Sequence, residues 1–144
     1  MRMRDFSRSL PMALLRAREA VMAEFRPILA AHDITEQQWR VLRALVDAPE
    51  GVGVGDLAAS TVLMGPSVSR ILVALEGRGL IRRSPVDHDG RRSIVAATPA
   101  GFELYESISP ASEDAYRRVE ERFGAADLDQ LHALLDRLST VLAD

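Results

Sequence analysis

The chain has 144 residues, of which 47% are hydrophobic, which is enough material for one domain with its own core. Zero cysteines exclude disulfides and thiol-based redox sensing within the chain. No apolar run is long enough for a membrane span or a signal peptide, so we expect a soluble, cytoplasmic protein without a membrane partner.

The formal net charge of −3 is unusual for a protein that binds nucleic acid, but the charge is unevenly distributed. Residues 1–50 hold eight Arg against seven acids, residues 51–98 six against four, and residues 99–144 four against ten. The middle is therefore locally basic, at +2, and the acidity lies in the last third, at −6. Every basic residue is Arg, which suits bidentate contacts to phosphate or guanine, although a GC-rich genome produces the same bias.

The first third of the chain predicts two helices. Residues 9–31 carry apolar side chains at three- and four-residue spacings, with Pro27 expected to kink or end the helix. The apolar stripe is wide for so small a protein, so we expect part of it to contact a second subunit. Thr35 and Gln38 have the spacing of a capping box, which predicts the start of a second helix, and Pro49-Glu50-Gly51 ends it.

The middle of the chain predicts a helix, a turn and a second helix. Residues 52–55 form a short extended piece, and Asp56 is the expected N-cap of a brief helix. Gly65-Pro66 indicates a turn into a helix over residues 66–78. At 100° per residue, that helix has one apolar face and an opposite face that bears Ser69, Arg70 and Val73.

A hairpin and two long helices complete the predicted elements. Residues 80–85 and 93–97 read as strands that flank an Asp/Arg-rich tip. Thr98 is the expected cap of a long helix that Pro110 should bend and Gly124 should end. Asp127 is the expected cap of the last helix, whose leucines form a seam more regular than one subunit needs, so we expect it to dimerise. The seam is Leu128, Leu131, Leu134, Leu135, Leu138 and Leu142.

The helix over residues 66–78 is the best candidate for insertion into a DNA groove. Ser67 and Ser69 are small donors that let the backbone approach phosphates, and Arg70 can reach a base edge or a phosphate. Val73 can touch a thymine methyl group. A solvated helix face would show the same residues, but the neighbouring short helix and hairpin favour DNA reading.

The hairpin tip is the second candidate element. Asp89 can brace the Arg91 guanidinium toward the minor groove, and Arg92 can contact a phosphate. The two arginines are adjacent, so either one can fill the minor-groove role. A charged turn alone is usually a solvated turn. Together with the preceding helix, it predicts a wing.

These segments resemble a known family. Leu80-Ile-Arg-Arg, Asp89-Gly-Arg-Arg and Ala97-Thr-Pro-Ala-Gly101, with Ser67-Val-Ser-Arg70 before them, resemble the multiple-antibiotic-resistance-regulator (MarR) family of bacterial winged helix-turn-helix repressors. The resemblance covers nearly the whole chain. The segments at residues 13–20, 25–28 and 34–40 look like the branch that represses operons for homoprotocatechuate (hydroxyphenylacetate) degradation.

The resemblance implies a mainly α fold with a small β-hairpin wing. It implies a homodimer, with residues 1–34 and 99–144 as the helical dimerisation region and residues 35–98 as the DNA-binding region, within one compact domain. Two recognition helices would enter successive major grooves of a palindromic, double-stranded operator. A small aromatic carboxylate would bind between the dimer helices and the reading region and release the DNA. Without cysteine, the peroxide-sensing mechanism of the family's thiol branches does not carry over.

The effector site implied by the resemblance needs a partner for a carboxylate. Arg16 and Arg18 are our candidates, because a bidentate Arg suits that group. Arginines on a helix also pair readily with nearby acids, such as Glu19 here. For the tryptophan named next, a place in the core is the alternative to a pocket wall. Further candidates for the same crevice are His32, Trp39, Arg40 and Arg43.

Rival functions have less support in the sequence. No Ser/His/Asp set, paired-acid motif or phosphate-cradling glycine loop is present, and the histidines lack metal-ligand spacing, so we expect no catalytic site, metal or cofactor. A winged-helix module that binds protein would show no steep salt dependence on duplex DNA, unlike a repressor. A MarR-type regulator of efflux or stress genes with a different effector is the remaining alternative.

Overall fold

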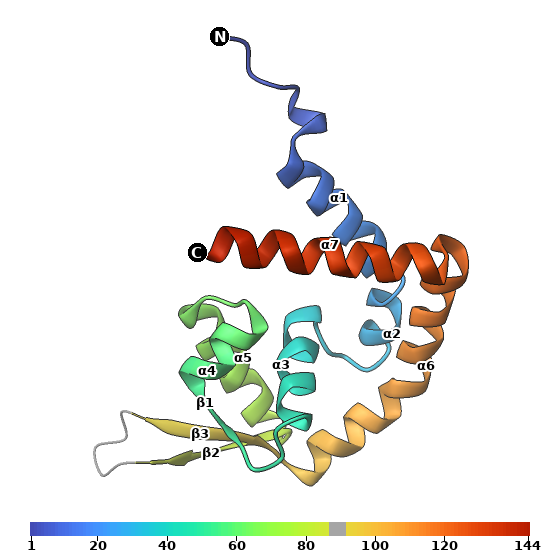
Figure 1. Cartoon of the computed structure of the whole chain (residues 1–144). Helices are drawn as coiled ribbons and strands as arrows, with labels where there is room; N and C mark the ends of the chain where they lie inside the picture. Colours follow the sequence, from blue (N-terminus) through green and yellow to red (C-terminus); the bar gives the residue numbers. More distant parts are fainter. Residues whose placement is uncertain (87–91) are drawn as a thin grey trace. The chain divides into compact units, whose positions relative to one another are not determined.

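The computed structural model describes residues 1–86 and 92–144, which form helices and a small three-stranded antiparallel sheet (Figure 1). The expected fold class, mainly α with a hairpin wing, is confirmed. The N-terminal elements are η1 (Phe6–Arg8), α1 (Leu10–Met22), α2 (Arg26–Ala30) and α3 (Glu36–Val46). The central elements are β1 (Val52–Gly53), α4 (Val54–Thr61), α5 (Gly65–Gly77), β2 (Ile81–Pro85) and β3 (Ser93–Ala97). The last two are α6 (Pro99–Phe123) and α7 (Ala125–Ala143).

The chain divides into two compact units. One comprises Met1–Phe25 with Ala111–Asp144, and the other comprises Arg26–Pro110. Residues 26–34 and 99–110 therefore pack with the helix-turn-helix and its wing, and the assignment of residues 1–34 and 99–144 to a dimerisation region stays a prediction. The reason for this packing is burial, since Leu29, Ile34 and Ile108 belong to the same hydrophobic core as the strands and α3 to α5.

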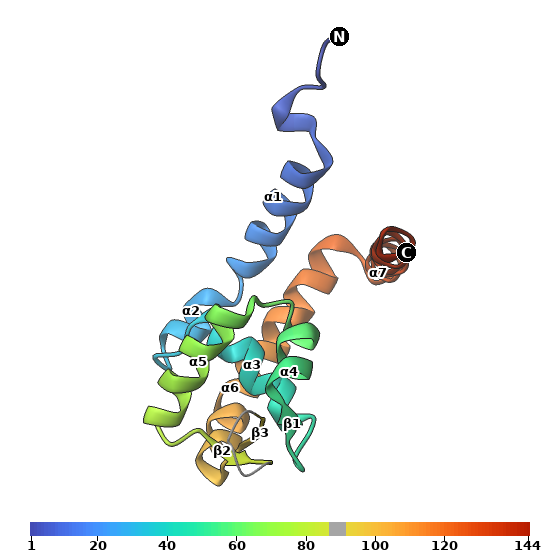
Figure 2. The same ribbon diagram turned by 90° about the vertical axis from the view of Figure 1, so that its left-hand side faces the viewer.

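The core of the unit Arg26–Pro110 is built around α3. Val41, Leu42 and Leu45 are fully buried, and α4 and α5 both pack against this helix (Figure 2). The predicted capping box is confirmed at the start of α3. The Gln38 backbone N–H donates to the Thr35 hydroxyl, and the Thr35 backbone N–H donates to the Gln38 side chain, both at 3.1 Å.

The sheet has the strand order β1-β3-β2. Both predicted strands are confirmed, and they pair antiparallel from Ile81 opposite Ala97 to Pro85 opposite Ser93. The piece expected only to be extended contributes β1, in which Val52 lies opposite Val95. Two paired residues are too few to show any hydrophobic period, so the sequence could not reveal this strand.

Two expected helix caps are wrong. Gly53, not Asp56, is the N-cap of α4, and Gly124, not Asp127, is the N-cap of α7. Both aspartates lie inside the first turn of their helices. A carboxylate is favourable at either place, because the first-turn N–H groups and the helix dipole attract negative charge, so the residue type does not distinguish them.

Pro27 was expected to kink or end its helix, and Pro110 to bend the long helix that follows Thr98. The expected helix over residues 9–31 is broken after Met22, and Pro27 is the second residue of α2, where its missing N–H costs nothing. Pro110 lies inside α6, which continues through it to Phe123.

No single helix among the described residues is long and apolar enough to cross a membrane. Only α4 and α5 together meet that test of length and composition, as a pair bent by 108°.

Candidate nucleic-acid interface

The helices α4 and α5 are joined by a tight turn. They are bent by 108° relative to one another, within the range of about 90–120° for helix-turn-helix motifs. Val62, in this turn, has φ of 56°, which is unusual for a β-branched residue. The N–H of Leu63 donates to the Ala58 carbonyl at 3.1 Å, so the turn closes on the end of α4.

Arg40 supports this turn from α3. Its guanidinium donates to the carbonyl of Thr61, the last residue of α4, at 3.0 Å. It also donates to the Glu36 carboxylate at 3.2 Å, and Arg26 donates to the other oxygen of that carboxylate at 3.3 Å. The network connects α2, α3 and the α4–α5 turn, so Arg40, a sequence candidate for effector binding, has a structural role in the helix-turn-helix.

The helix α5 presents the face that the sequence predicted. Val68, Leu72 and Leu75 are fully buried, while Ser69 and Arg70 are exposed and Val73 is 65% exposed. Ser67 is half-buried, and it lines a hollow together with Arg70. An apolar side chain that is left in solvent beside small donors and a guanidinium is a suitable surface for base edges and phosphates.

The wing is formed by β2 and β3. Beyond the paired strands, the N–H of Val86 donates to the Arg92 carbonyl at 3.0 Å, and Arg92 is exposed. Asp89 and Arg91, the other two wing candidates, lie outside the described residues. On β2, Arg82 is exposed and Arg83 is half-buried.

A cavity of about 560 Å³ lies beside the wing. It is lined by Asp56 near the start of α4, by Arg83 and by Arg92 with its neighbour Ser93. The Arg83 Nε atom is buried and has no hydrogen-bond partner within residues 1–86 and 92–144. Arg83 is not among the site residues predicted from the sequence, although the period-two alternation of a strand places it on the opposite face from Arg82.

The base of the wing is fastened to the start of α6. The N–H of Thr98 donates to the Leu80 carbonyl at 3.0 Å, and its hydroxyl donates to the Gly79 carbonyl at 2.6 Å. The same hydroxyl accepts from the N–H of Gly101 at 3.2 Å. Gly101 is required here, because a β-carbon would collide with the carbonyl oxygen of Leu80. Thr98 therefore caps α6 as predicted and also holds the wing.

The end of α5 is fastened to the loop between α2 and α3. Arg78 donates to the carbonyls of Asp33 and His32 at 2.6 and 3.3 Å. The His32 Nδ1 atom lies 3.0 Å from the Ile28 carbonyl. His32, a sequence candidate for effector binding, is thus part of a loop that contacts the last turn of the candidate recognition helix.

The remaining effector candidates have different surroundings. Trp39 is buried and stacks on Tyr105, with ring centroids 5.6 Å apart, and Arg43 is exposed on the last turn of α3. Arg16 and Arg18 are exposed on α1, in the other compact unit, and Arg18 lies 3.8 Å from the Glu19 carboxylate. Trp39 therefore lies in the core, which is one of the two positions that its residue type suggested.

The unit formed by Met1–Phe25 and Ala111–Asp144 has few buried side chains. Neither α1 nor α7 contains a buried residue, and the exposed fraction of the leucine side chains reaches 72% at Leu142. Glu24 pairs with Arg118 and Arg122 at 3.5 and 3.3 Å. The two helices thus expose apolar faces that this chain does not cover within its own unit.

Groups of three or more His, Cys, Asp or Glu side chains that could hold a metal ion do not occur in the described part of the chain. The hollow at α5 is lined instead by the Arg70 guanidinium, hydroxyls and amides, and the cavity beside the wing by Arg83 and Arg92.

A bent helix pair with an exposed Ser/Arg face, followed by a hairpin with exposed arginines, defines a winged helix-turn-helix protein of the DNA-binding type. Residues 32–92 match the family model described as MarR family. The homoprotocatechuate degradative operon repressor of Escherichia coli is 41% identical over 128 residues, which are 89% of this chain and 86% of that protein. The chain belongs to the MarR family.

Solved structures agree with this assignment. The transcriptional regulator PA4135 has a TM-score of 0.84 and 40% identity, covering 92% of this chain and 97% of that one. NadR in complex with 4-hydroxyphenylacetate has a TM-score of 0.78 and 36% identity, covering 96% of this chain and 97% of that one. The family resemblance seen in the sequence is therefore confirmed, and the similarity to the Escherichia coli repressor supports the branch.

Proposed function

We propose that this protein is a homodimeric repressor of a catabolic operon for aromatic acids, which leaves its operator when a small phenolic or aromatic carboxylate binds. The observation that carries the DNA-binding part is the face of α5, where Ser69, Arg70 and Val73 are exposed opposite a fully buried apolar face. Two similar proteins support the effector class. One is the repressor of a homoprotocatechuate degradative operon, and the other, NadR, has been solved in complex with 4-hydroxyphenylacetate.

In this proposal, α5 enters the major groove. Arg70 contacts a base edge or phosphate, Ser67 and Ser69 contact phosphates, and Val73 packs on a thymine methyl group. The wing contributes Arg92 together with Asp89 and Arg91. Residues 51–98 have a net charge of only +2, from six Arg against four acids, so strong binding requires two readers on one palindromic site.

The terminal helices provide the dimer in this proposal. Leu131, Leu134 and Leu135 on α7 are all exposed, as are Leu10 and Leu14 on α1. Apolar helix faces of this length bury themselves against another helix when one is available. A second copy of the chain, which presents the same faces, is the partner we propose.

We keep Arg16 and Arg18 as candidates for binding the effector carboxylate, and Trp39 and His32 as further candidates for effector contact. Arg40 and Arg43 complete the set of candidates. A guanidinium binds a carboxylate through two parallel hydrogen bonds, which suits recognition of a small acid. The proposed protein acts in the cytoplasm, where its operator lies, and its function includes no catalytic step.

The test is a titration of duplex DNA from upstream of its own gene, followed by fluorescence anisotropy at two salt concentrations. We expect affinity to fall steeply with salt and a phenolic or phenylacetic acid to release the DNA at a fixed salt concentration. Shallow salt dependence together with the same affinity for any duplex would contradict an operator-binding repressor and favour a module that binds protein.

A further inference from the structure

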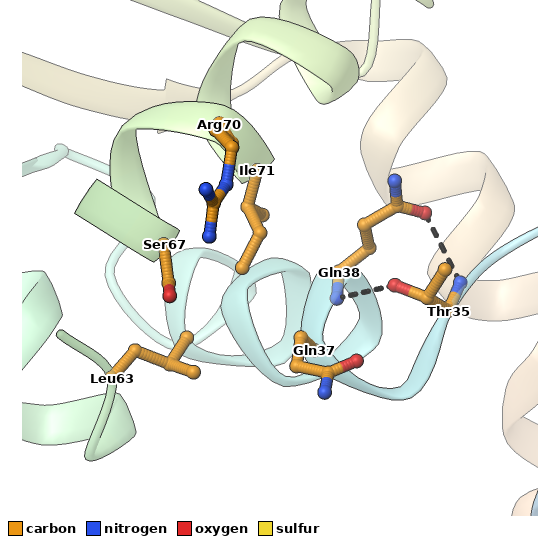
Figure 3. Close-up of a pocket in the computed structure, with 7 residues that line it drawn as sticks. All are labelled: Thr35, Gln37, Gln38, Leu63, Ser67, Arg70 and Ile71. Carbon is orange, nitrogen blue, oxygen red and sulfur yellow. Dashed lines mark hydrogen bonds between the residues drawn. The ribbon is translucent and has the colours of Figure 1, made fainter. Parts of the chain in front are cut away.

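A hollow of about 330 Å³ opens between the start of α3 and the start of α5. Figure 3 shows Ser67 and Arg70 on the α5 wall and Gln37 on the α3 wall. The side chains of Leu63 and Ile71 supply its apolar surface. Because α5 carries the proposed DNA-reading face, the hollow adjoins that face.

The donors in this hollow are not used by the protein itself. The side chains of Gln37, Ser67 and Arg70 make no hydrogen bond or ion pair with any residue in the ranges 1–86 and 92–144. Thr35 and Gln38, which also line the hollow, are instead occupied by the capping box of α3. The three unused groups are an amide, a hydroxyl and a guanidinium, and all of them donate hydrogen bonds.

The charge of the hollow favours an anion. Arg70 is its charged group, and none of its described lining residues is acidic. A phosphodiester offers two anionic oxygens to donors that line this hollow from two helices, and the adjoining deoxyribose suits contact with Leu63 and Ile71. A helix start also favours negative charge, which adds to the side-chain donors here.

We propose that this hollow binds a backbone phosphate of duplex DNA, with Gln37 donating from α3 while Ser67 and Arg70 donate from α5. This inference rests on the proposed DNA-binding function and adds Gln37, on a helix outside the helix-turn-helix pair, to the interface. The phosphate joins the starts of two helices and so sets how deeply α5 enters the groove. The contact carries no sequence information, because every nucleotide has the same phosphate.

Gln37 is a suitable position for the test because α3 does not need it. Gln38, not Gln37, forms the capping box, and Gln37 is exposed. Ala and Lys are both good helix formers, so their substitution keeps the helix. Thermal unfolding of each variant checks that the fold is retained.

The experiment measures binding of the full chain to operator DNA and to an unrelated duplex of equal length, over a range of salt concentrations. Gln37→Ala should weaken both complexes by the same factor, about fivefold for each protomer and so about 25-fold for the dimer, the effect of one lost hydrogen bond per protomer. Gln37→Lys should steepen the dependence of log K on log salt by about 1.8, from one added phosphate contact in each protomer, and tighten binding at low salt. Gln37→Glu should weaken both complexes more than Gln37→Ala does. The control is Ala30→Lys, which adds the same charge at an exposed position of α2 and should change the slope much less.

Three results would overturn the inference. Wild-type affinity and slope in Gln37→Glu and Gln37→Lys would exclude a phosphate in the hollow, and loss of binding in Arg70→Ala would then show that the proposed function survives. A loss confined to the operator would mean that Gln37 contacts a base. Unchanged DNA binding with weaker binding of 4-hydroxyphenylacetate by Gln37→Glu would mean that the hollow holds an effector carboxylate. If the wild type bound no DNA, or bound it with only a shallow dependence on salt, that result would instead contradict the proposed function itself.

Discussion

The guanidinium of Arg78, just beyond the last turn of α5, donates a hydrogen bond of 2.6 Å to the carbonyl of Asp33 in the loop between α2 and α3. Asp33 has φ of 53°, a conformation that costs energy for a residue other than glycine and that surrounding contacts must support. A second hydrogen bond from Arg78 reaches the His32 carbonyl at 3.3 Å. The end of the candidate recognition helix is thus held by a loop residue, Asp33, that lies 45 positions before Arg78 in the chain.

This relationship predicts the effect of Arg78→Ala. Losing both hydrogen bonds should lower the free energy of unfolding by about 1 kcal/mol, because the groups are exposed and water replaces part of the interaction. Operator affinity should fall as well, since the end of α5 is no longer fastened. Urea unfolding and a gel-shift titration measure the two effects. Arg78→Lys keeps the charge but cannot reach both carbonyls, so its stability and its operator affinity should both lie between those of the wild type and Arg78→Ala. If Arg78→Lys were as unstable as Arg78→Ala but bound operator like the wild type, the charge of Arg78 and not its hydrogen bonds would matter for DNA binding.

Arg40→Ala distinguishes a structural from an effector role. The substitution removes the hydrogen bond to the Thr61 carbonyl, so the α4–α5 turn should loosen and the free energy of unfolding should fall by about 1–2 kcal/mol. The effector-free protein should bind its operator several-fold more weakly. Gln37→Ala, an exposed position on the same helix, is the control for stability and should unfold like the wild type. If Arg40→Ala bound operator normally and lost only the effector response, the structural role would be wrong.

Gly101→Ala tests the fastening of the wing. The added β-carbon would collide with the Leu80 carbonyl oxygen, so helix α6 and the base of the wing would have to separate. We expect a loss of about 2–3 kcal/mol, measured by chemical unfolding, in the range of strained backbone substitutions. Gly55→Ala in α4 is the matched control, because nothing lies within 4 Å of its added carbon. That control should be neutral or stabilising by up to about 1 kcal/mol. Equal effects of the two substitutions would exclude a steric requirement at Gly101.

The proposed DNA contacts predict a change in salt dependence. Arg70→Ala should weaken operator binding at least tenfold and lower the magnitude of the salt slope by about 1.8, since one phosphate contact is lost in each of the two protomers. Combined Arg91→Ala and Arg92→Ala substitutions should lower it by about twice as much. Size-exclusion chromatography should show an unchanged dimer in both cases. Arg137→Ala on α7, distant in sequence from the reader, serves as the control and should leave the slope unaltered.

Arg16→Ala tests the proposed effector site. The variant should bind operator with wild-type affinity but require at least tenfold more aromatic acid for release, because a bidentate partner of the carboxylate is lost. Calorimetry with 4-hydroxyphenylacetate measures the loss directly. Arg8→Ala, which removes an exposed arginine of η1, is the control. Release at the wild-type concentration of acid would remove Arg16 from the site.

The sequence predicted the parts of the fold that depend on neighbours in the chain. The capping box at Thr35 and Gln38 and the cap at Thr98 arise from hydrogen bonds over three residues, and the two wing strands pair residues 8 to 16 positions apart; all are confirmed. The caps at Asp56 and Asp127 were wrong because an aspartate suits both the cap and the first turn. The strand β1 was missed because its pairing with β3 joins residues more than 40 positions apart, such as Val52 and Val95.

The candidate site divides in the same way. Helical periodicity alone selected the exposed face of α5, with Ser69, Arg70 and Val73, because burial of one helix face determines the other. Gln37 was not selected, since only the tertiary structure brings the start of α3 beside the start of α5.

The sequence by itself thus determined the order of elements, the polar face of α5, the family resemblance and the small net positive charge of residues 51–98, on which the proposal of a dimer rests. Only the tertiary structure decided which arginines serve the fold and which are available to ligands. Arg40 and Arg78 donate to backbone carbonyls 21 and 45 residues away, whereas Arg70 lines an open hollow. A carbonyl belongs to every residue and leaves no mark in the sequence, so a guanidinium that binds one cannot be recognised before the chain is folded.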